Sequence, residues 1–348
     1  MTHPTHTGPL VYEFGWELLG LDGSPRGMLE GTSGGRLERS IFTERRYGGS
    51  LTLVDRRQVD EWADVMLRPW CYVAGHSYPL ATVIPSLPTG AWDSTSTRLS
   101  LRFFDRTQRL ARHSRPHHVG VNPGENVIAV VDWLCRHADP FDARTALTPS
   151  PATVRTPMGW EPGTPTLTII NELLTSIGYS AIRTDVWGTY RAYPYVVPAE
   201  RPLVHEYLPG PDARHLSTAT EEHNLDSVHN HVLVVGKREG DEPPPIGEAR
   251  NTNELDPLSI PRRGVHTRRE QDSDVVDAPT AQRLAERLLA EERQTVRSVE
   301  FEHVWWPAEL EGKERLVTSQ GLDLTGVRVK DSWTLTPGTL VRATLREV

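Results

Sequence analysis

The chain of 348 residues has little cysteine and no long apolar run. Its two cysteines, Cys71 and Cys135, exclude a disulfide scaffold and a cysteine-based zinc finger. We expect two buried thiols, with a single bridge as the alternative. No segment reaches the roughly 18 apolar residues of a membrane-spanning helix, and the first residues lack the basic start and apolar core of a signal peptide. We therefore expect a soluble protein made in a cytoplasm.

Lysine is scarce, because only Lys237, Lys313 and Lys330 are found among 38 basic residues. Arginine has GC-rich codons, so a high-GC genome explains the bias; arginine selected for bidentate contacts is the alternative. The net charge of −8 does not suggest a nucleic-acid binder. We expect no sequence-specific nucleic-acid partner.

Motifs for enzyme chemistry are missing from the sequence. It contains no phosphate-binding loop, no dinucleotide-binding glycine motif before a helix, no nucleophile elbow, no H-E-x-x-H and no EF-hand loop. We therefore predict a protein that is not an enzyme, and we assign no catalytic, cofactor-binding or metal-binding residue.

Two groups of side chains still require an alternative interpretation. His223, His229 and His231 lie near one another, and His229 and His231 would share one face of a strand. Hydrogen-bonded or solvated histidines are favoured; the alternative is a metal site whose third ligand is Glu221, Glu222 or Asp226. The acidic run of Asp272, Asp274 and Asp277 is interpreted as a solvated loop that caps the next helix rather than as a calcium site.

Tryptophan is frequent, with ten residues, and Trp305-Trp306 precedes Pro307. In a strand the two rings would point to opposite faces, so we expect one in a core and the other at an edge or interface. Stacking of a sugar ring is the alternative.

Glycine and proline are abundant, at 27 and 28 residues, which predicts many short elements joined by turns. Residues 8–110 are expected to form a first β-barrel domain. Leu99, Leu101 and Phe103 alternate with polar residues, as in a half-buried strand, while 59–66 has the spacing of one short helix.

Residues 111–214 are expected to form a helical and hairpin insert. Asn122 is placed as a helix N-cap before Pro123, and a second helix is expected to start at Thr164-Pro165 and to stop at Gly178. A hairpin turning at Trp187-Gly188 follows. No tandem repeat of 20–50 residues is apparent.

Residues 215–348 are expected to form a second β-barrel domain with one helix. The apolar run 232–235 predicts a strand buried on both faces, and Asp277 and Pro279 open an amphipathic helix. Only strands are expected after that helix. The predicted fold class is α+β, mostly β.

The chain resembles the baseplate hub and tail-tip family of phage tails, which is related to the hub part of type VI secretion spike proteins. The resemblance rests on the order and spacing of several segments over residues 8–348: the Gly31–Gly35 turn with Tyr47–Leu53, the Ile169–Gly178 helix with its hairpin through Val196, Asn230–Gly236, Asp256-Pro257, the Ala281–Leu289 helix, and the closing strands Leu322–Leu345.

This resemblance implies a homotrimer in which each chain contributes two tube-type β-barrel domains to a pseudo-sixfold ring. The ring would join the tail tube to the tip and let DNA pass during ejection. The implied partners are a tail tube or distal tail protein, a tape measure protein and a separate central spike or fibre protein. The expected location is the virion tail tip, assembled in the cytoplasm of an actinobacterial host. A glycan-binding or cell-wall-degrading tail module is the alternative function, and another phage structural role also stays open.

Overall fold

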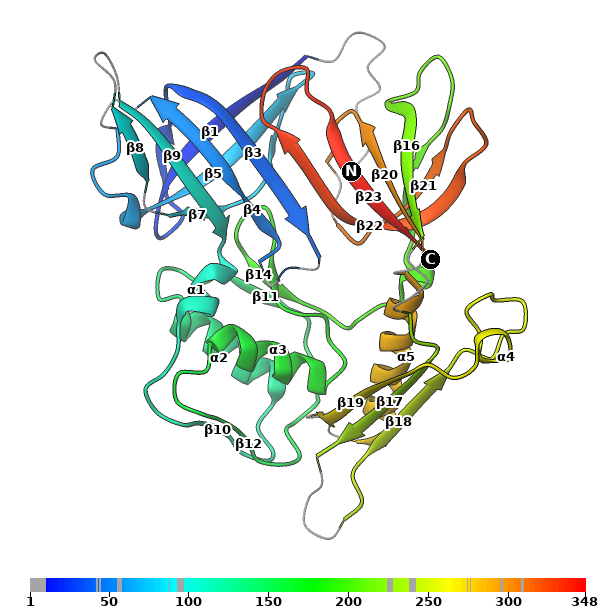
Figure 1. Ribbon diagram of the computed structural model, residues 1–348. Helices are drawn as coiled ribbons and strands as arrows, with labels where there is room; N and C mark the ends of the chain where they lie inside the picture. Colours follow the sequence, from blue (N-terminus) through cyan, green and yellow to red (C-terminus); the bar gives the residue numbers. More distant parts are fainter. Residues whose placement is uncertain are drawn as a thin grey trace.

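The computed structural model (Figure 1) describes residues 11–41, 43, 45–54, 58–86, 88–92, 97–223, 228–237, 242–273, 275, 277–294, 297–307 and 310–348. Strands make up 45% of the structure and helices 18%, which confirms the α+β, mostly β class. None of the described helices is long and apolar enough to cross a membrane. Figure 1 shows two strand blocks side by side above a lower layer that contains the helices.

The first strand block is formed by the N-terminal residues. Its strands are β1 (Tyr12–Gly20), β2 (Pro25–Met28), β3 (Thr32–Ser40), β4 (Tyr47–Val54), β5 (Val65–Val73), β6 (His76–Pro79), β7 (Val83–Pro85), β8 (Thr89–Trp92) and β9 (Thr97–Asp105). The alternation of Leu99, Leu101 and Phe103 places all three in the core, as predicted. The helix predicted over 59–66 is wrong: only η1 (Trp62–Asp64) is helical. Val65 and the following residues instead pair with β1 along nine positions, and this long-range pairing outweighs the local helical spacing.

The second strand block is formed by the C-terminal residues and one earlier segment. Its strands are β15 (Leu203–Tyr207), β16 (His215–His223), β20 (Arg297–His303), β21 (Lys313–Val317), β22 (Asp323–Thr334) and β23 (Val341–Glu347). The prediction that only strands follow the last helix is confirmed for the described residues. All strands of both blocks belong to one 15-stranded sheet, whose main path runs from β16 to β2.

The insert lies below the first block and has its own core. Its elements are α1 (Thr107–Arg112), β10 (Val119–Val121), α2 (Val127–Ala138), β11 (Thr145–Leu147), β12 (Met158–Trp160), α3 (Thr166–Ser176), β13 (Arg183–Thr184), β14 (Tyr190–Ala192) and η2 (Pro198–Glu200). The hairpin is confirmed, because β13 and β14 are antiparallel and Gly188 supplies the left-handed turn at φ 80°.

The predicted start of α2 is one turn too early. Asn126, not Asn122, is the N-cap: its side-chain oxygen accepts a hydrogen bond from Ala129 N at 3.0 Å. Asn122 lies in a preceding turn, where its backbone N–H donates to Glu125 Oε1 at 2.9 Å. Gly124 has a φ of 90°, a left-handed conformation that ends any helix started at Asn122.

The insert contains an internal repeat, so the prediction of no repeat is wrong. β10 begins at residue 119 and β12 at 158, and α2 begins at 127 and α3 at 166, so both pairs are 39 positions apart. The two strands pair antiparallel around Gly120 and Gly159. Matching backbone hydrogen bonds cross between the halves, because Gly124 N donates to Val154 O and Gly163 N donates to Arg115 O. Residues 113–138 and 152–177 are therefore two halves related by a local twofold axis.

A third unit, the αβ module, lies below the second block. It contains β17 (His231–Gly236), β18 (Ile246–Arg250), α4 (Ile260–Arg263), β19 (Thr267–Ser273) and α5 (Ala278–Gln294). Asp277 caps α5 by accepting from Thr280 N at 2.8 Å, as predicted. The prediction that 232–235 is buried on both faces is wrong. Val232 and Val234 are buried and pack in the same cluster as Ala281 and Ala285 of α5, whereas the intervening residues are only half-buried, because α5 covers one face of this three-stranded sheet.

Candidate functional site at the junction of the strand blocks

The two strand blocks are joined by direct strand pairing. β22 is twelve residues long, and its end from Lys330 to Thr334 pairs antiparallel with residues 36–40 of β3. The pairing continues beyond both ends, because Leu335 N donates to Gly35 O at 2.7 Å and Ile41 N donates to Val329 O at 3.0 Å. A continuous ladder of backbone hydrogen bonds fixes the two blocks relative to each other.

A buried ionic network lies beside this pairing. Arg39 of β3 donates from Nε and Nη2 to the two carboxylate oxygens of Asp331 in β22, and Arg328 of β22 donates to Glu314 of β21 at 2.9 and 3.1 Å. Arg328 also donates to Asp331 at 3.4 Å and to the Tyr207 hydroxyl. All of these side chains are buried. Burial disfavours the charge on Arg328, but the neighbouring Glu314, Tyr207 and Asp331 outweigh it and raise its pKa.

Burying such charges is tolerated only when each is paired, and removing one partner of a buried pair costs about 3–5 kcal/mol. Because Arg39 comes from the first block and Asp331 from the second, the network makes the joint between the blocks specific in geometry.

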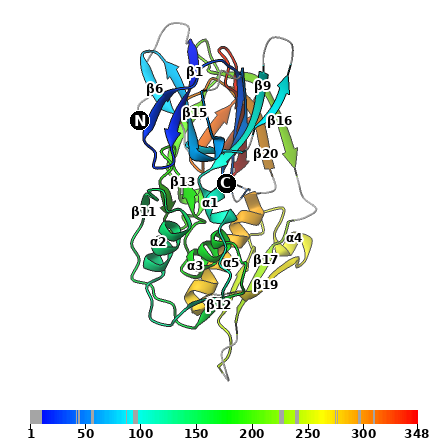
Figure 2. The same ribbon diagram turned by 90° about the vertical axis from the view of Figure 1, so that its left-hand side faces the viewer.

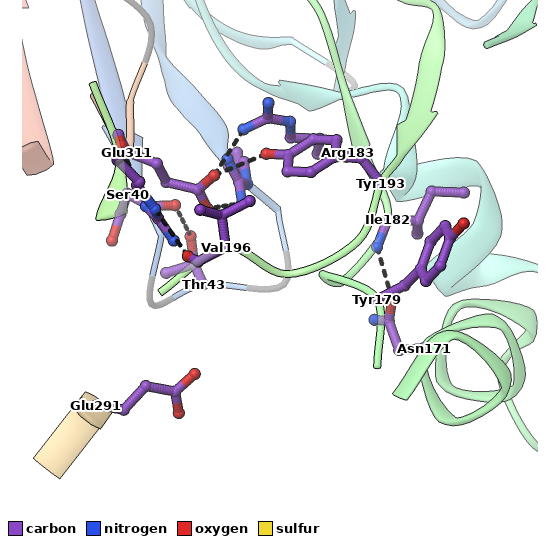
Figure 3. Close-up of polar contacts among 12 residues, drawn as sticks. Ser40, Thr43, Asn171, Tyr179, Ile182, Arg183, Tyr193, Val196, Glu291 and Glu311 are labelled. Atoms are coloured by element: carbon purple, nitrogen blue, oxygen red, sulfur yellow. Dashed lines mark hydrogen bonds and ion pairs between the residues drawn. The ribbon is translucent and has the colours of Figure 1, made fainter. Parts of the chain in front are cut away.

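A second ion cluster connects the insert to the same joint (Figure 3). Glu311 precedes β21, and its carboxylate accepts hydrogen bonds from Arg183 at 3.0 Å, from the Tyr193 hydroxyl at 2.7 Å and from Arg46. Arg201 donates to the Glu311 carbonyl at 3.1 Å. We call these five residues the Glu311 clamp. Arg46 follows β3 in the first block, while Arg183 and Tyr193 belong to the insert, so the clamp holds three parts of the chain together.

The electrostatics of the clamp favour the ionised carboxylate. Burial disfavours the charge on Glu311, but Arg46 and Arg183 outweigh burial and lower its pKa from 4.5 to about 2. Burial also raises the pKa of Tyr193 to about 12, so its hydroxyl remains a donor. Glu311 has a φ of 72°, a left-handed conformation that non-glycine residues adopt at a cost of about 1 kcal/mol or more. The ion pairs offset this cost.

An open cavity of about 620 Å³ lies beside the clamp. Arg183, Tyr193 and Glu311 line one part of it, and Val196, Val204 and Trp306 give it an apolar wall. Among the described residues, no group of three or more His, Cys, Asp or Glu side chains is arranged to hold a metal ion.

No protein-family model matches the chain, and no curated protein matches it significantly in sequence. Solved structures match it over nearly its whole length. A tail protein from Neisseria meningitidis MC58 has a TM-score of 0.69 and 13% identity, covering 97% of this chain and 96% of that one. The 43 kDa tail protein of prophage MuSo2 from Shewanella oneidensis has a TM-score of 0.66 and 12% identity, covering 97% and 98%. The chain has the fold of phage tail proteins.

The tail-protein fold also extends to secretion machinery. A component of the Escherichia coli type VI secretion system, described as similar to the T4 bacteriophage tail proteins gp27 and gp5, has a TM-score of 0.52 and 12% identity, covering 99% of this chain and 76% of that one. The resemblance predicted from the spacing of segments is thereby confirmed in its fold.

Within this tail-protein fold, the tryptophan pair lies at the junction of the blocks. Trp305 is buried in the core of the first block, where the Tyr12 hydroxyl donates to its carbonyl at 3.1 Å. Trp306 packs on the core of the second block, stacks on His205 and donates to the Tyr207 hydroxyl at 2.8 Å. Trp305 is buried, as predicted, and Trp306 is half-buried; that the second ring serves as an edge or interface anchor stays a prediction.

The other residues singled out from the sequence have structural partners. Cys71 and Cys135 are free and buried, as predicted. His229 contacts Glu292 at 3.0 Å, and His231 contacts Glu248 at 2.8 Å, so these two histidines are engaged separately. His223 contacts Glu221 at 2.8 Å. Asp226 and Asp274 lie outside the described residues.

The Glu311 clamp is the feature that sequence reasoning missed. Its members come from residues 46, 183, 193, 201 and 311, with no motif around any of them. An isolated glutamate before a strand is indistinguishable from the other acidic residues, so no signal in the sequence points to it.

Proposed function

We propose that this protein is a structural baseplate hub or tail-tip protein of a bacteriophage that forms a trimeric ring. The ring joins the tail tube to the tip and lets DNA pass during ejection. Two observations support the proposal: the likeness of nearly the whole chain to tail proteins, and the edge-to-edge joining of two strand blocks within one chain. The continuous strand pairing between the blocks is the main support for this proposal. It makes each chain supply two adjacent strand blocks to the wall of the proposed ring.

The proposed domains are a first tube-like β-barrel domain at 8–110, an insert at 111–214 and a second tube-like domain at 215–348. Within these bounds α1 starts before the insert, β15 joins the second strand block, and the αβ module is part of the second tube-like domain's range. The main sheet path ends at β16 and β2. Eight of the nine β16 residues are exposed, so a long edge with unpaired backbone groups is presented to a partner. A heterologous contact between the two ends, repeated around a threefold axis, closes a ring of six strand blocks.

The charge of the chain is compatible with a passage for DNA. A wall rich in cations would hold the phosphate backbone, whereas a chain of net charge −8 does not. In this proposal the partners are a tail tube or distal tail protein, a tape measure protein and a separate central spike or fibre protein. The protein is assembled in the cytoplasm of an actinobacterial host and resides at the virion tail tip, and it has no enzymatic activity.

The proposal is tested by the mass of the purified protein and by its position in particles. Native mass spectrometry is expected to show three times the chain mass of 39.0 kDa. Gold-labelled antibody is expected to bind one end of the phage tail in electron micrographs. A protein that stays monomeric at all concentrations and never enters tail particles would contradict the proposal. Zymography and a glycan pull-down with the same sample test the alternative, and clearing or retention would support it instead.

A further inference from the structure

The two halves of the insert differ in what covers them. The half at 152–177 faces the αβ module of the same chain: Arg155 forms an ion pair with Asp277 at 3.4 Å, and Arg287 of α5 donates at 3.3 Å to the carbonyl of Tyr179, two residues after this half. The half at 113–138 lies on the other side of the local twofold axis. This half and the residues just after it expose large aromatic side chains, because Trp133 is 48% exposed and Phe141 is 44% exposed.

A groove runs between β10 and α2 on this outer half. We call it the Trp133 groove, and its volume is about 610 Å³. Its lining includes Arg115, His118, Val121, Ala129, Val130 and Trp133. The Arg115 guanidinium lies over the Trp133 ring, 4.5 Å from its centre, and the His137 ring stacks on Trp133 with 5.1 Å between the ring centres. The indole therefore has two aromatic or cationic neighbours and still exposes about half of its surface to a binding partner.

The equivalent place in the other half is closed. Glu172 occupies the position of Trp133 in the repeat, 39 residues later, and accepts a hydrogen bond from the Trp160 indole. Trp160 itself is buried, with an exposed fraction of 7%. The repeat therefore provides its own comparison: one half closes the site internally, and the other leaves it open.

A loop with an exposed leucine lies on the opposite side of the molecule. The segment 251–259, which we call the Leu255 loop, presents Leu255 with 84% of its surface exposed. The loop is held by its own polar groups: Asn253 Oδ1 accepts from Leu255 N at 3.1 Å, Asp256 Oδ1 accepts from Leu258 N at 2.9 Å, and Arg262 donates to the Glu254 carbonyl at 2.8 Å. A rigid loop that exposes a leucine loses little entropy on binding.

The positions of the two features match a head-to-tail ring. In Figure 1 the α4 region, which follows the Leu255 loop, lies at the right of the lower layer, and α2 lies at the left of the same layer. Figure 2, turned by 90°, again places α2 and α4 on opposite sides. Repetition of the chain around an axis brings the right side of one copy against the left side of the next. The exposed Glu254 next to Leu255 would then face a groove whose lining includes Arg115 as well as Glu125, and its charge is complementary to that of Arg115.

We propose that the Leu255 loop of each copy inserts into the Trp133 groove of the neighbouring copy and locks the lower layer of the ring. This contact rests on the ring proposed above and names the surfaces that join its subunits. The leucine is the apolar anchor, and the pair of Glu254 and Arg115 orients it at the rim.

Disulfide cross-linking tests the contact in the intact chain. The variants Leu255→Cys and Ala129→Cys are prepared with tags of different size, mixed and oxidised. Cys71 and Cys135 do not interfere, because both are fully buried. The matched control replaces Ala129→Cys by Thr168→Cys, the equivalent position in the other half of the repeat. A mixed disulfide between the two tagged chains is expected at least about tenfold above this control, because only apposed cysteines satisfy disulfide geometry.

A second variant measures how much Leu255 contributes to the affinity between the subunits. Leu255→Asp is expected to raise the dissociation constant of the oligomer about 30-fold, the size of a strong interface anchor. Ile246→Asp, at another exposed apolar position of the αβ module, is the control and is expected to leave it unchanged. An oligomer of three chain masses that gives no mixed disulfide above the control overturns this contact and leaves the proposed ring intact. A protein that forms no oligomer at any concentration overturns both.

Discussion

The substitution Glu311→Gln tests whether the Glu311 clamp holds the insert to the strand blocks. Glutamine keeps the size of the side chain and the left-handed backbone at this position, and it removes only the charge. Arg46 and Arg183 then lose their ion partner while their side chains are only 11% and 16% exposed. Two cations left close together in a partly desolvated place destabilise the folded state.

The magnitude follows from the pKa of the carboxyl. Lowering it from 4.5 to about 2 in the folded protein corresponds to about 3 kcal/mol of stability at neutral pH. Because the pKa of Glu311 is lower in the folded state than in the unfolded state, this stability is complete above pH 5 and is lost as the pH falls towards 2. For a chain of 348 residues, 3 kcal/mol lowers the melting temperature by about 4 °C.

Thermal unfolding of both proteins between pH 7 and pH 2.5 provides the assay. The difference in melting temperature between wild type and Glu311→Gln is expected to be about 4 °C at pH 7 and to shrink by about half near pH 3. Glu200→Gln, an exposed glutamate in the nearby η2 turn, is the matched control and is expected to follow the wild type at every pH.

The result that refutes this reasoning is a constant difference. If Glu311→Gln and the wild type run parallel from pH 7 to pH 2.5, the carboxylate does not titrate below its usual range, and the clamp does not stabilise the joint through charge. A difference of less than 1 °C at pH 7 would refute it as well.

Two further substitutions test the fold, each with a neighbouring control. A Cβ at Gly49 would lie 2.0 Å from the Arg36 carbonyl oxygen and 2.6 Å from the Phe103 ring, so Gly49→Ala is expected to lower the melting temperature by several degrees. A Cβ at Gly48 would have no contact closer than 3.8 Å, so Gly48→Ala is the control and is expected to change the melting temperature by less than about 1 °C. If Gly49→Ala and Gly48→Ala lower the melting temperature by the same amount, the observed pairing of β3 with β4 is contradicted. Asn126→Ala removes the cap of α2 and is expected to lower the free energy of unfolding, measured with denaturant, by about 1–2 kcal/mol. Asn122→Ala is the control and is expected to lower it by less than about 0.5 kcal/mol. A larger loss for Asn122→Ala than for Asn126→Ala would show that the helix starts at Asn122.

Local signals in the sequence were sufficient where neighbouring residues decide the structure. The alternation in β9, the cap and apolar face of α5, and the glycine turns at Gly178 and Gly188 were all predicted and are all observed. Local signals failed where distant residues compete. The segment 59–66 has helical spacing, but β1 is available as a partner for β5, and the ladder between them decides the structure.

The internal repeat shows a different kind of failure. The shared pattern Gly-x-x-Pro-Gly at 120–124 and 159–163 is present in the sequence, but the surrounding residues differ, with Trp133 matched by Glu172. A twofold-symmetric body tolerates this divergence, because each half needs only apolar residues towards the shared core. The symmetry therefore becomes evident from the register of β10 and β12 rather than from identities.

The sequence by itself determined the composition of the parts: mostly strands, a helical insert, buried thiols, and a tryptophan pair divided between two environments. These follow from periodicity, turn residues and burial of apolar area, which act over a few residues. Only the tertiary structure decided how the parts join. The pairing of β22 with β3, the buried contact of Arg39 with Asp331 and the Glu311 clamp each link residues more than a hundred positions apart. Their energy depends on geometry and desolvation, which a linear sequence does not show.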